Sequence, residues 1–142
     1  MNQTKIIFSA ALLIFSAAYC SGNPSNSQTE QSALQSISMS EFSDIVKKDP
    51  SIKVLDVRTP QEFAEGHVPG AKLFSLQDIQ AQGASVSANL PFTKEDKIYI
   101  ICKSGGRSMK ATQMLTSLGY KDVTNVEGGT MGFIRMGNKV EN

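Results

Sequence analysis

Short apolar runs alternate with helical patterns from residue 34 to about residue 136 of the chain. Two runs, Lys53–Val57 and Lys97–Cys102, have the continuous apolar character of buried strands. Weaker strand patterns lie at Ala33–Ser38, Ala71–Phe74 and Asp122–Val126. Strands that alternate with helical segments favour a parallel sheet covered by helices. The pattern therefore predicts an α/β domain with a central parallel sheet of about five strands.

Helix start signals lie directly after the first two strand patterns. Ser40 is placed to cap a helix over Glu41–Lys48, whose last turn carries two lysines. Thr59–Glu62 (TPQE) is a capping box with proline at the first helical position. We expect a helix to begin directly after Arg58.

A third helix is predicted from an apolar stripe after the second strong strand. Arg107–Leu118 carries methionine and leucine at helical spacing, and Gly119 stands where a left-handed residue ends a helix. Methionines at this spacing are more typical of a core than of a metal site. The polar stretch 78–90 contains only one short predicted helix, over Leu76–Ala81.

The N-terminal segment has the organisation of an export signal. Lys5 supplies the positive charge, and the apolar stretch Ile6–Ala18 is shorter than the roughly 20 residues that span a bilayer. Two processing routes fit the sequence: cleavage after Ala18, or lipidation of Cys20, whose position resembles a bacterial lipoprotein signal. We expect export to the bacterial periplasm or cell envelope, with membrane contact only through a lipid on Cys20.

Composition narrows the remaining possibilities. A length of 142 residues leaves room for one domain, predicted over 34–138, after a leader at 1–20 and a flexible polar linker at 21–33. The net charge is +1, and loss of Lys5 brings it to zero, which argues against nucleic-acid binding. Two cysteines and one histidine cannot supply the four ligands of a structural zinc site, so no metal site is expected.

The loop Cys102–Arg107 (CKSGGR) is the candidate chemical centre because it follows a strand and opens a helix. Its backbone N–H groups can converge on one point, where the helix dipole adds positive charge. Gly105 and Gly106 would allow the tight turn. Cys102, flanked by Lys103 and Arg107, is therefore expected to have a lowered pKa and to act as a nucleophile.

Three segments of the chain resemble motifs of the rhodanese-like family. Val54–Ala71 (VLDVRTPQEFAEGHVPGA) is similar to its first motif, and Cys102–Arg107 fits its C-x-x-G-x-R active-site loop. Val123–Phe133 (VTNVEGGTMGF) is similar to its C-terminal motif, with Phe133 where the family usually has tryptophan. The resemblance covers about residues 35 to 135.

This resemblance implies a three-layer α/β domain that transfers sulfane sulfur. Cys102 would accept sulfur as a persulfide from a small anionic donor such as thiosulfate and pass it to cyanide or a thiol. The residues that would cradle the persulfide and the donor are Lys103, Ser104, Gly105, Gly106 and Arg107. No metal or organic cofactor is expected, and an exported enzyme of this kind would need a thiol partner such as a thioredoxin-like reductant.

Four charged or titratable residues of the first motif are expected to have structural roles: Asp56, Arg58, Glu62 and His67. Asp56 and Arg58 lie at one strand end, where pairing with each other is favoured over lining the site. The resemblance implies that both, together with Glu62, tie the first motif together. It also places His67, the sole histidine, in a turn, in preference to a general base beside Cys102.

Two other functions and one other state of the cysteine are less consistent with the sequence than sulfur transfer. Phosphatase or arsenate-reductase chemistry is the first rival, because phosphatases of the same fold have five residues between cysteine and arginine. Here Lys103–Gly106 supplies four, which should fit a phosphoester poorly. Rhodanese-like domains that only bind partners have lost the cysteine that this chain retains as Cys102. A disulfide between Cys20 and Cys102 would abolish the nucleophile and is disfavoured.

Overall fold

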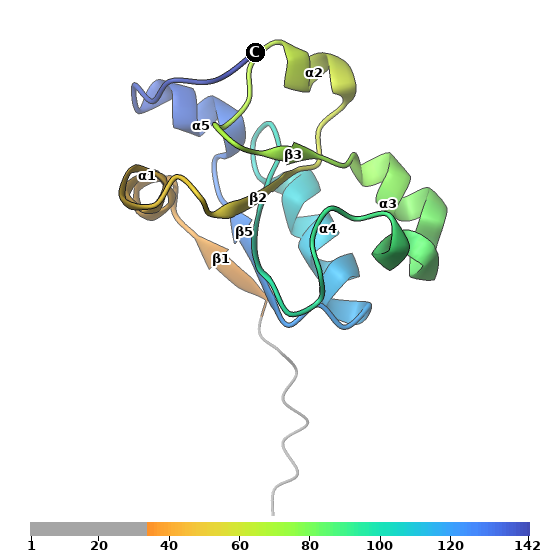
Figure 1. Cartoon of the computed structure of the whole chain (residues 1–142). Coiled ribbons are helices and arrows are strands. Elements are labelled where there is room, and N and C mark those ends of the chain that lie inside the picture. Colours follow the sequence, from red (N-terminus) through yellow and green to blue (C-terminus); the bar gives the residue numbers. More distant parts are fainter. Residues whose placement is uncertain (1–33) are drawn as a thin grey trace, which may run out of the picture.

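The computed structural model describes residues 34–142, and these form a five-stranded parallel sheet in the order β1-β5-β4-β2-β3 (Figure 1). This confirms the predicted α/β fold. The strands are β1 (Gln35–Ile37), β2 (Lys53–Asp56), β3 (Lys72–Leu73), β4 (Lys97–Ile101) and β5 (Asp122–Val126). The predicted leader, Cys20 and the linker at 21–33 lie outside the described residues.

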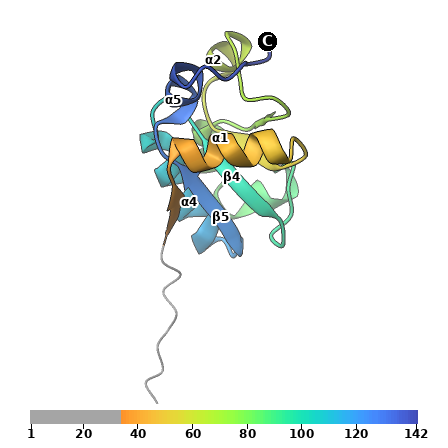
Figure 2. The same cartoon turned by 90° about the vertical axis from the view of Figure 1, so that its left-hand side faces the viewer.

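Helices cover both faces of the sheet (Figures 1 and 2). They are α1 (Met39–Lys48), α2 (Pro60–Ala64), α3 (Leu76–Gln82), the 3-10 helix η1 (Gly83–Ala88), α4 (Gly106–Ser117) and α5 (Gly129–Arg135). Helices α1 and α5 pack on one face, whereas α3, η1 and α4 pack on the other. Within residues 34–142, no helix is long and apolar enough to cross a bilayer.

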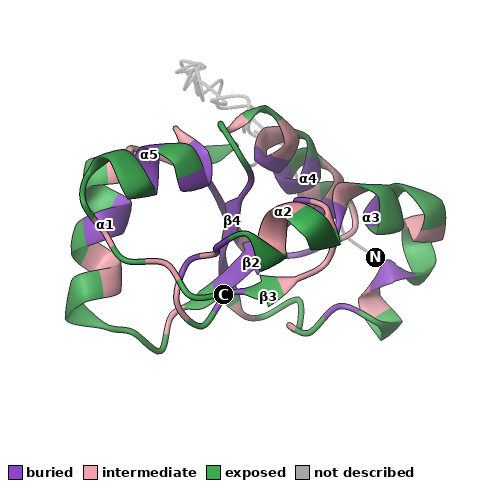
Figure 3. Ribbon diagram, turned by 90° about the horizontal axis from the view of Figure 1, so that it is seen from above, coloured by how far each residue is buried: buried purple, intermediate pink, exposed green. Residues whose placement is uncertain are grey.

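Each central strand divides its side chains between the two layers, because successive residues of a strand point to opposite faces. Ile98 and Ile100 of β4 join the core beneath α4, and Tyr99 joins the core beneath α1. Phe42 of α1 and Phe133 of α5 meet within that second core, with ring centroids 6.0 Å apart. Figure 3 shows the buried positions, in purple, along β2 and β4 and on the inner sides of the helices.

The N-terminal cap of α1 differs from the prediction. Ser38, not Ser40, caps the helix: it has extended backbone, and its hydroxyl accepts the N–H of Glu41 at 3.3 Å. The Glu41 side chain in turn accepts the Ser38 N–H at 3.0 Å. This reciprocal capping box satisfies two otherwise unpaired N–H groups, which a cap at Ser40 could not do with the residues that follow it.

Other element boundaries differ from the predictions by a few residues. Strands β2 and β4 end one residue early, so Val57 and Cys102 already belong to loops. Helix α4 begins at Gly106, and Gly119 has the expected left-handed backbone with φ +90°. The stretch 78–90, predicted to be mostly irregular, contains the end of α3 and all of η1.

The sheet order places the two main sequence motifs beside one another. Strand β4 lies in the centre, with β2 and β5 as its neighbours. All strands are parallel, so the loops that follow them meet at the same carboxyl edge of the sheet. The loop after β2, which carries Arg58, therefore lies next to the loop that begins at Cys102.

Candidate active site

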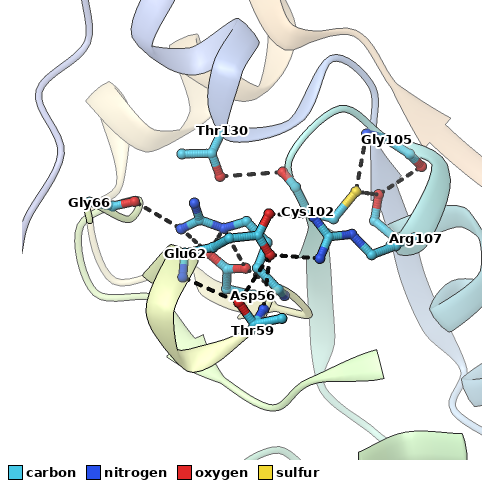
Figure 4. A network of polar contacts seen from close by, with 10 residues as sticks. Asp56, Thr59, Glu62, Gly66, Cys102, Gly105, Arg107 and Thr130 are labelled. Atoms are coloured by element: carbon cyan, nitrogen blue, oxygen red, sulfur yellow. Dashed lines mark hydrogen bonds and ion pairs between the residues drawn. The ribbon is translucent and has the colours of Figure 1, made fainter. Parts of the chain in front are cut away.

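The Cys102 sulfur lies inside the loop that joins β4 to α4 (Figure 4). The residue is 1% exposed, and its Sγ accepts the backbone N–H of Gly105 at 3.1 Å. The hydroxyl of Ser108, in the first turn of α4, lies 3.4 Å from the same sulfur. Gly105 reaches this position with φ +109°, a left-handed backbone that glycine adopts without strain.

These contacts set the protonation of the sulfur. Burial raises the pKa of Cys102. Hydrogen bonds to the sulfur lower it and outweigh burial: the largest comes from the Ser108 side chain, and the others come from the backbone of Ser108, Gly105 and Ser104. The net result is a pKa below the ordinary value of 9.0. The direction is the one predicted from the loop, although its main cause, the hydroxyl of Ser108, was not foreseen.

Helix α5 fixes the outer side of the loop. The N–H groups of Thr130 and Met131 donate to the carbonyl oxygens of Cys102 and Lys103, at 2.8 and 3.2 Å. A Cβ on Gly129 would lie 2.3 Å from the Cys102 oxygen, so only glycine allows this approach. Because these carbonyls point toward α5, neighbouring N–H groups of the loop are free to point toward the sulfur.

Arg107 is held by an acidic residue from α2. Its Nη1 and Nη2 each donate to one oxygen of Glu62, both at 2.7 Å. Glu62 also accepts the Thr59 N–H at 3.1 Å, which completes the predicted capping box of α2. Hydrogen bonds from Arg107 are the main reason that the pKa of Glu62 falls to about 2. Glu62 thus joins the first motif to the active-site loop, which the sequence did not predict.

Asp56 and Arg58 form a buried pair. Arg58 Nε donates to both Asp56 oxygens at 3.0 Å, and its Nη2 donates to Oδ2 at 2.8 Å. The same Nη2 also donates to the Gly66 carbonyl oxygen at 2.8 Å. The Arg58 side chain is only 6% exposed and that of Asp56 is 0% exposed, so each buried charge depends on the other for compensation.

His67 lies in the turn after α2, and its polar contacts are structural. Its Nδ1 is 3.1 Å from the Phe63 carbonyl oxygen, and its ring stacks on that of Phe63 with centroids 3.7 Å apart. Backbone hydrogen bonds of 2.8 and 2.9 Å join His67 to Glu141 near the C-terminus. These contacts tie the turn to the C-terminal segment.

Two small cavities open beside the loop. One, of about 180 Å³, is lined by Lys103 and Glu62 with Met131 and Ile134 of α5. The other, of about 210 Å³, is lined by Arg107 and Lys110 with polar residues of α3. Lys103 is exposed and makes no ion pair within residues 34–142. The loop therefore presents positive charge toward both openings.

The structure brings most of the predicted site together and adds residues to it. Cys102 to Arg107 form one loop, with Glu62 against it, whereas Asp56, Arg58 and His67 make their contacts beside it. Gly106 has an ordinary backbone and open space where a Cβ would lie, so it does not need to be glycine. Ser108 was missed because a serine in an amphipathic helix gives no signal of its own. Gly129 was missed because glycine is required there by the carbonyl group of Cys102, which is distant in the sequence.

A family model for the Rhodanese-like domain matches residues 38–136. Thiosulfate sulfurtransferase 16, chloroplastic, of Arabidopsis thaliana is 36% identical over 91 residues, which cover 60% of this chain and 76% of that protein. The Bacillus subtilis protein YrkF, whose name describes a sulfur carrier, is 34% identical over 104 residues and 73% of this chain. The chain spans about half of YrkF, 53% of its length.

A solved structure of a rhodanese-like protein has the same fold as this chain. The crystal structure of a rhodanese-like domain protein from Staphylococcus aureus superimposes with a TM-score of 0.61 at 32% identity, covering 76% of this chain and 97% of that one. Relatives are named as sulfurtransferases or sulfur carriers, which supports sulfur transfer at the level of the family. Since the matched region contains the whole Cys102 loop together with Glu62 and Gly129, which hold it in place, this chain belongs to the rhodanese-like domain family.

Proposed function

We propose that the protein is a sulfurtransferase that moves sulfane sulfur from thiosulfate to a thiophilic acceptor through a persulfide on Cys102. The observation that carries the proposal is the Cys102 sulfur held by hydrogen bonds from Gly105 and Ser108, with a lowered pKa. A thiolate at neutral pH is the nucleophile that such chemistry needs. The names of relatives support the same class of reaction.

The first step forms the persulfide. The Cys102 thiolate attacks the outer sulfur of thiosulfate, a new S–S bond forms, and the bond between the two sulfurs of thiosulfate breaks. The electron pair of that bond leaves with sulfite, and no proton is transferred. The N–H groups that now face Sγ would then stabilise the negative charge of the persulfide.

The second step returns the cysteine to its thiolate. Cyanide attacks the outer sulfur of the persulfide, the S–S bond breaks, and its electron pair returns to the Cys102 sulfur as thiocyanate leaves. A thiol acceptor would take the sulfur in the same way and become a persulfide itself. Both steps occur on the Cys102 sulfur, so we propose that neither a metal nor an organic cofactor takes part.

The charged residues at the openings would attract and orient the donor. Lys103 is exposed at the cavity of about 180 Å³ and has no ion-pair partner among residues 34–142 that an anion would have to displace. Arg107 offers a guanidinium fork that matches the oxygens of a sulfonate-like group. Lys110 adds a further positive charge beside Arg107.

The cellular setting is part of the proposal and depends on the sequence alone. The segment 1–20 would direct export to the periplasm or cell envelope, with Cys20 as the candidate lipid attachment. An exported nucleophilic thiol must be kept reduced. We therefore expect a small thiol or a thioredoxin-like protein as reductant or natural acceptor.

The test is thiocyanate formation from thiosulfate and cyanide by the chain without its leader (residues 21–142), with Cys102→Ser as the matched variant. The expected result is turnover by the parent protein and none by Cys102→Ser. Mass spectrometry after thiosulfate treatment should show one added sulfur on Cys102. Folded, reduced protein that neither turns over nor gains sulfur would contradict the proposal. Hydrolysis of a phosphotyrosine mimic faster than thiosulfate turnover would do so as well.

A further inference from the structure

The anion-binding fork of Arg107 is already occupied by a carboxylate of the protein. Both of its terminal nitrogens donate to Glu62, one to each oxygen, at 2.7 Å (Figure 4). A guanidinium fork binds one carboxylate or one oxyanion group at this edge, and not both. An anionic donor that is to bind Arg107 in this way must therefore take the place of Glu62.

The two residues of this ion pair line different cavities beside the loop. Glu62 lines the cavity of about 180 Å³, Arg107 lines the cavity of about 210 Å³, and Arg58 lines both. Cys102 is 1% exposed and lines neither of them.

The Glu62–Arg107 pair is better suited to exchange than the neighbouring Asp56–Arg58 pair. The side chains of Arg107 and Glu62 are 35% and 23% exposed, whereas those of Arg58 and Asp56 are 6% and 0% exposed. Partly hydrated ions lose less when they separate than buried ions do. Glu62 would also keep hydrogen bonds to Thr59, whose N–H and hydroxyl lie 3.1 and 3.3 Å from the carboxylate.

We propose that Glu62 is a specificity-determining residue that competes with the donor for Arg107, so that an oxyanion group must displace its carboxylate to reach Cys102. The proposal rests on the proposed function, because it assigns the order of events at the same site. The competition with Glu62 would select donors whose oxygens bind the Arg107 guanidinium more strongly than the Glu62 carboxylate does. A donor without an oxyanion group gains nothing from the displacement.

The test measures thiosulfate binding by calorimetry in a Cys102→Ser background, where no sulfur is transferred. Glu62→Gln keeps the length of the side chain and the capping oxygen for Thr59 but removes the charge that holds Arg107. We expect thiosulfate to bind about fivefold more tightly to the full-length Cys102→Ser/Glu62→Gln protein than to Cys102→Ser. In the catalytically intact chain, Glu62→Gln should lower KM for thiosulfate by a similar factor.

Glu65 provides the matched control. It is the C-terminal capping residue of α2, lines the same cavity as Glu62 and makes no ion pair among the described residues. Glu65→Gln removes the same charge from the same region without releasing Arg107. We expect its thiosulfate affinity to stay within about twofold of the Cys102→Ser parent, since exposed charges interact weakly.

Several outcomes would overturn the proposal. If Glu62→Gln leaves thiosulfate binding unchanged or weakens it, Glu62 only positions Arg107. An equal gain in Glu65→Gln would show a general charge effect. If Glu62→Gln does not fold, Glu62→Asp, which withdraws the carboxylate by one methylene, should also tighten binding, and its failure to do so would count equally. Tighter binding by a protein that forms no thiocyanate would contradict the proposed function and leave the competition standing.

Discussion

Thr130 donates its backbone N–H to the carbonyl oxygen of Cys102 at 2.8 Å, and its hydroxyl lies 3.3 Å from the same oxygen. The first turn of α5 thereby fixes the peptide that carries the nucleophile. Met131 does the same for the next carbonyl, that of Lys103. The loop is shaped from outside by α5 as well as from inside by its own glycine and the start of α4.

Replacement of Gly129 tests this support directly. In Gly129→Ala, the new Cβ would lie 2.3 Å from the Cys102 oxygen and 2.5 Å from Lys103 backbone atoms, so the helix and the loop must separate. We expect a loss of about 2–3 kcal/mol in unfolding free energy, measured in urea, and a fall in sulfur transfer of at least about tenfold.

Gly106→Ala is the matched control for this substitution. Its Cβ would meet nothing within 4 Å, and the residue begins α4 with ordinary backbone. Alanine there should be neutral or stabilising by up to about 1 kcal/mol. Equal damage from both substitutions would show that the loop rejects any side chain, independently of its contact with α5.

Ser108 should tune the nucleophile. In Ser108→Ala, the hydroxyl beside Sγ is lost, so the pKa of Cys102 should rise from its lowered position. The pH profile of kcat/KM should then shift to higher pH, with activity at neutral pH about tenfold lower and nearly restored in alkaline solution. The thiolate absorbance of the free enzyme should titrate at the same higher pH.

Ser104 offers the control for that prediction. Its side chain is exposed, and it reaches Sγ only through its backbone, which alanine retains. Ser104→Ala should therefore titrate like the parent. An unchanged profile in Ser108→Ala would mean that the amides alone hold the thiolate.

Glu62 should make the domain sensitive to acid. Its pKa is about 2 in the folded chain against an ordinary 4.5, so the folded state favours the ionised carboxylate. This contribution to stability is complete above about pH 4.5 and is lost as the pH falls toward 2. Glu62→Gln should be less stable than the parent at neutral pH and should lose less stability between pH 4.5 and 2 in urea titrations. A parallel loss in both proteins would assign the acid sensitivity to other groups.

The buried pair of Asp56 and Arg58 should act as a unit. Arg58→Met leaves the Asp56 charge buried without its partner, which should cost about 3–5 kcal/mol of unfolding free energy. Asp56→Asn/Arg58→Met removes both charges and should recover much of this loss. Lys121→Met is the control, because it breaks the ion pair with Glu95, whose two side chains are 68% and 69% exposed. It should cost at most about 1 kcal/mol of unfolding free energy. A single variant as mild as Lys121→Met would contradict the buried-pair interpretation.

The elements that the sequence predicted best are those whose cause is local. The apolar runs of β2 and β4 and the capping box Thr59–Glu62 appear in the structure because each residue set specifies its own conformation. Helix α5 was not predicted, since the left-handed Gly128 and Gly129 that precede and begin it favour a turn in isolation. It forms because Phe133 is buried against α1 and its first N–H groups find the loop carbonyls.

In the candidate site, too, local features were predicted and contacts between distant residues were not. The nucleophile and its loop were predicted from a contiguous segment, Cys102–Arg107. The contact of Arg107 with Glu62 joins residues 45 positions apart, and that of Thr130 with Cys102 joins residues 28 apart. Such pairs depend on the order of the strands, which a strand pattern alone does not specify. Local chemistry was therefore accessible from sequence, and the partners that hold it in place were not.

The parallel sheet also gives the domain a direction. Every strand begins at one edge and ends at the other, so β1 begins at Gln35 on the edge opposite to the one where β4 ends and the Cys102 loop starts. Whatever precedes β1 in the chain joins the described domain at that edge, away from the loop that holds the sulfur. A partner that approaches the Cys102 loop would therefore meet the domain at the edge opposite to the one where the described chain starts.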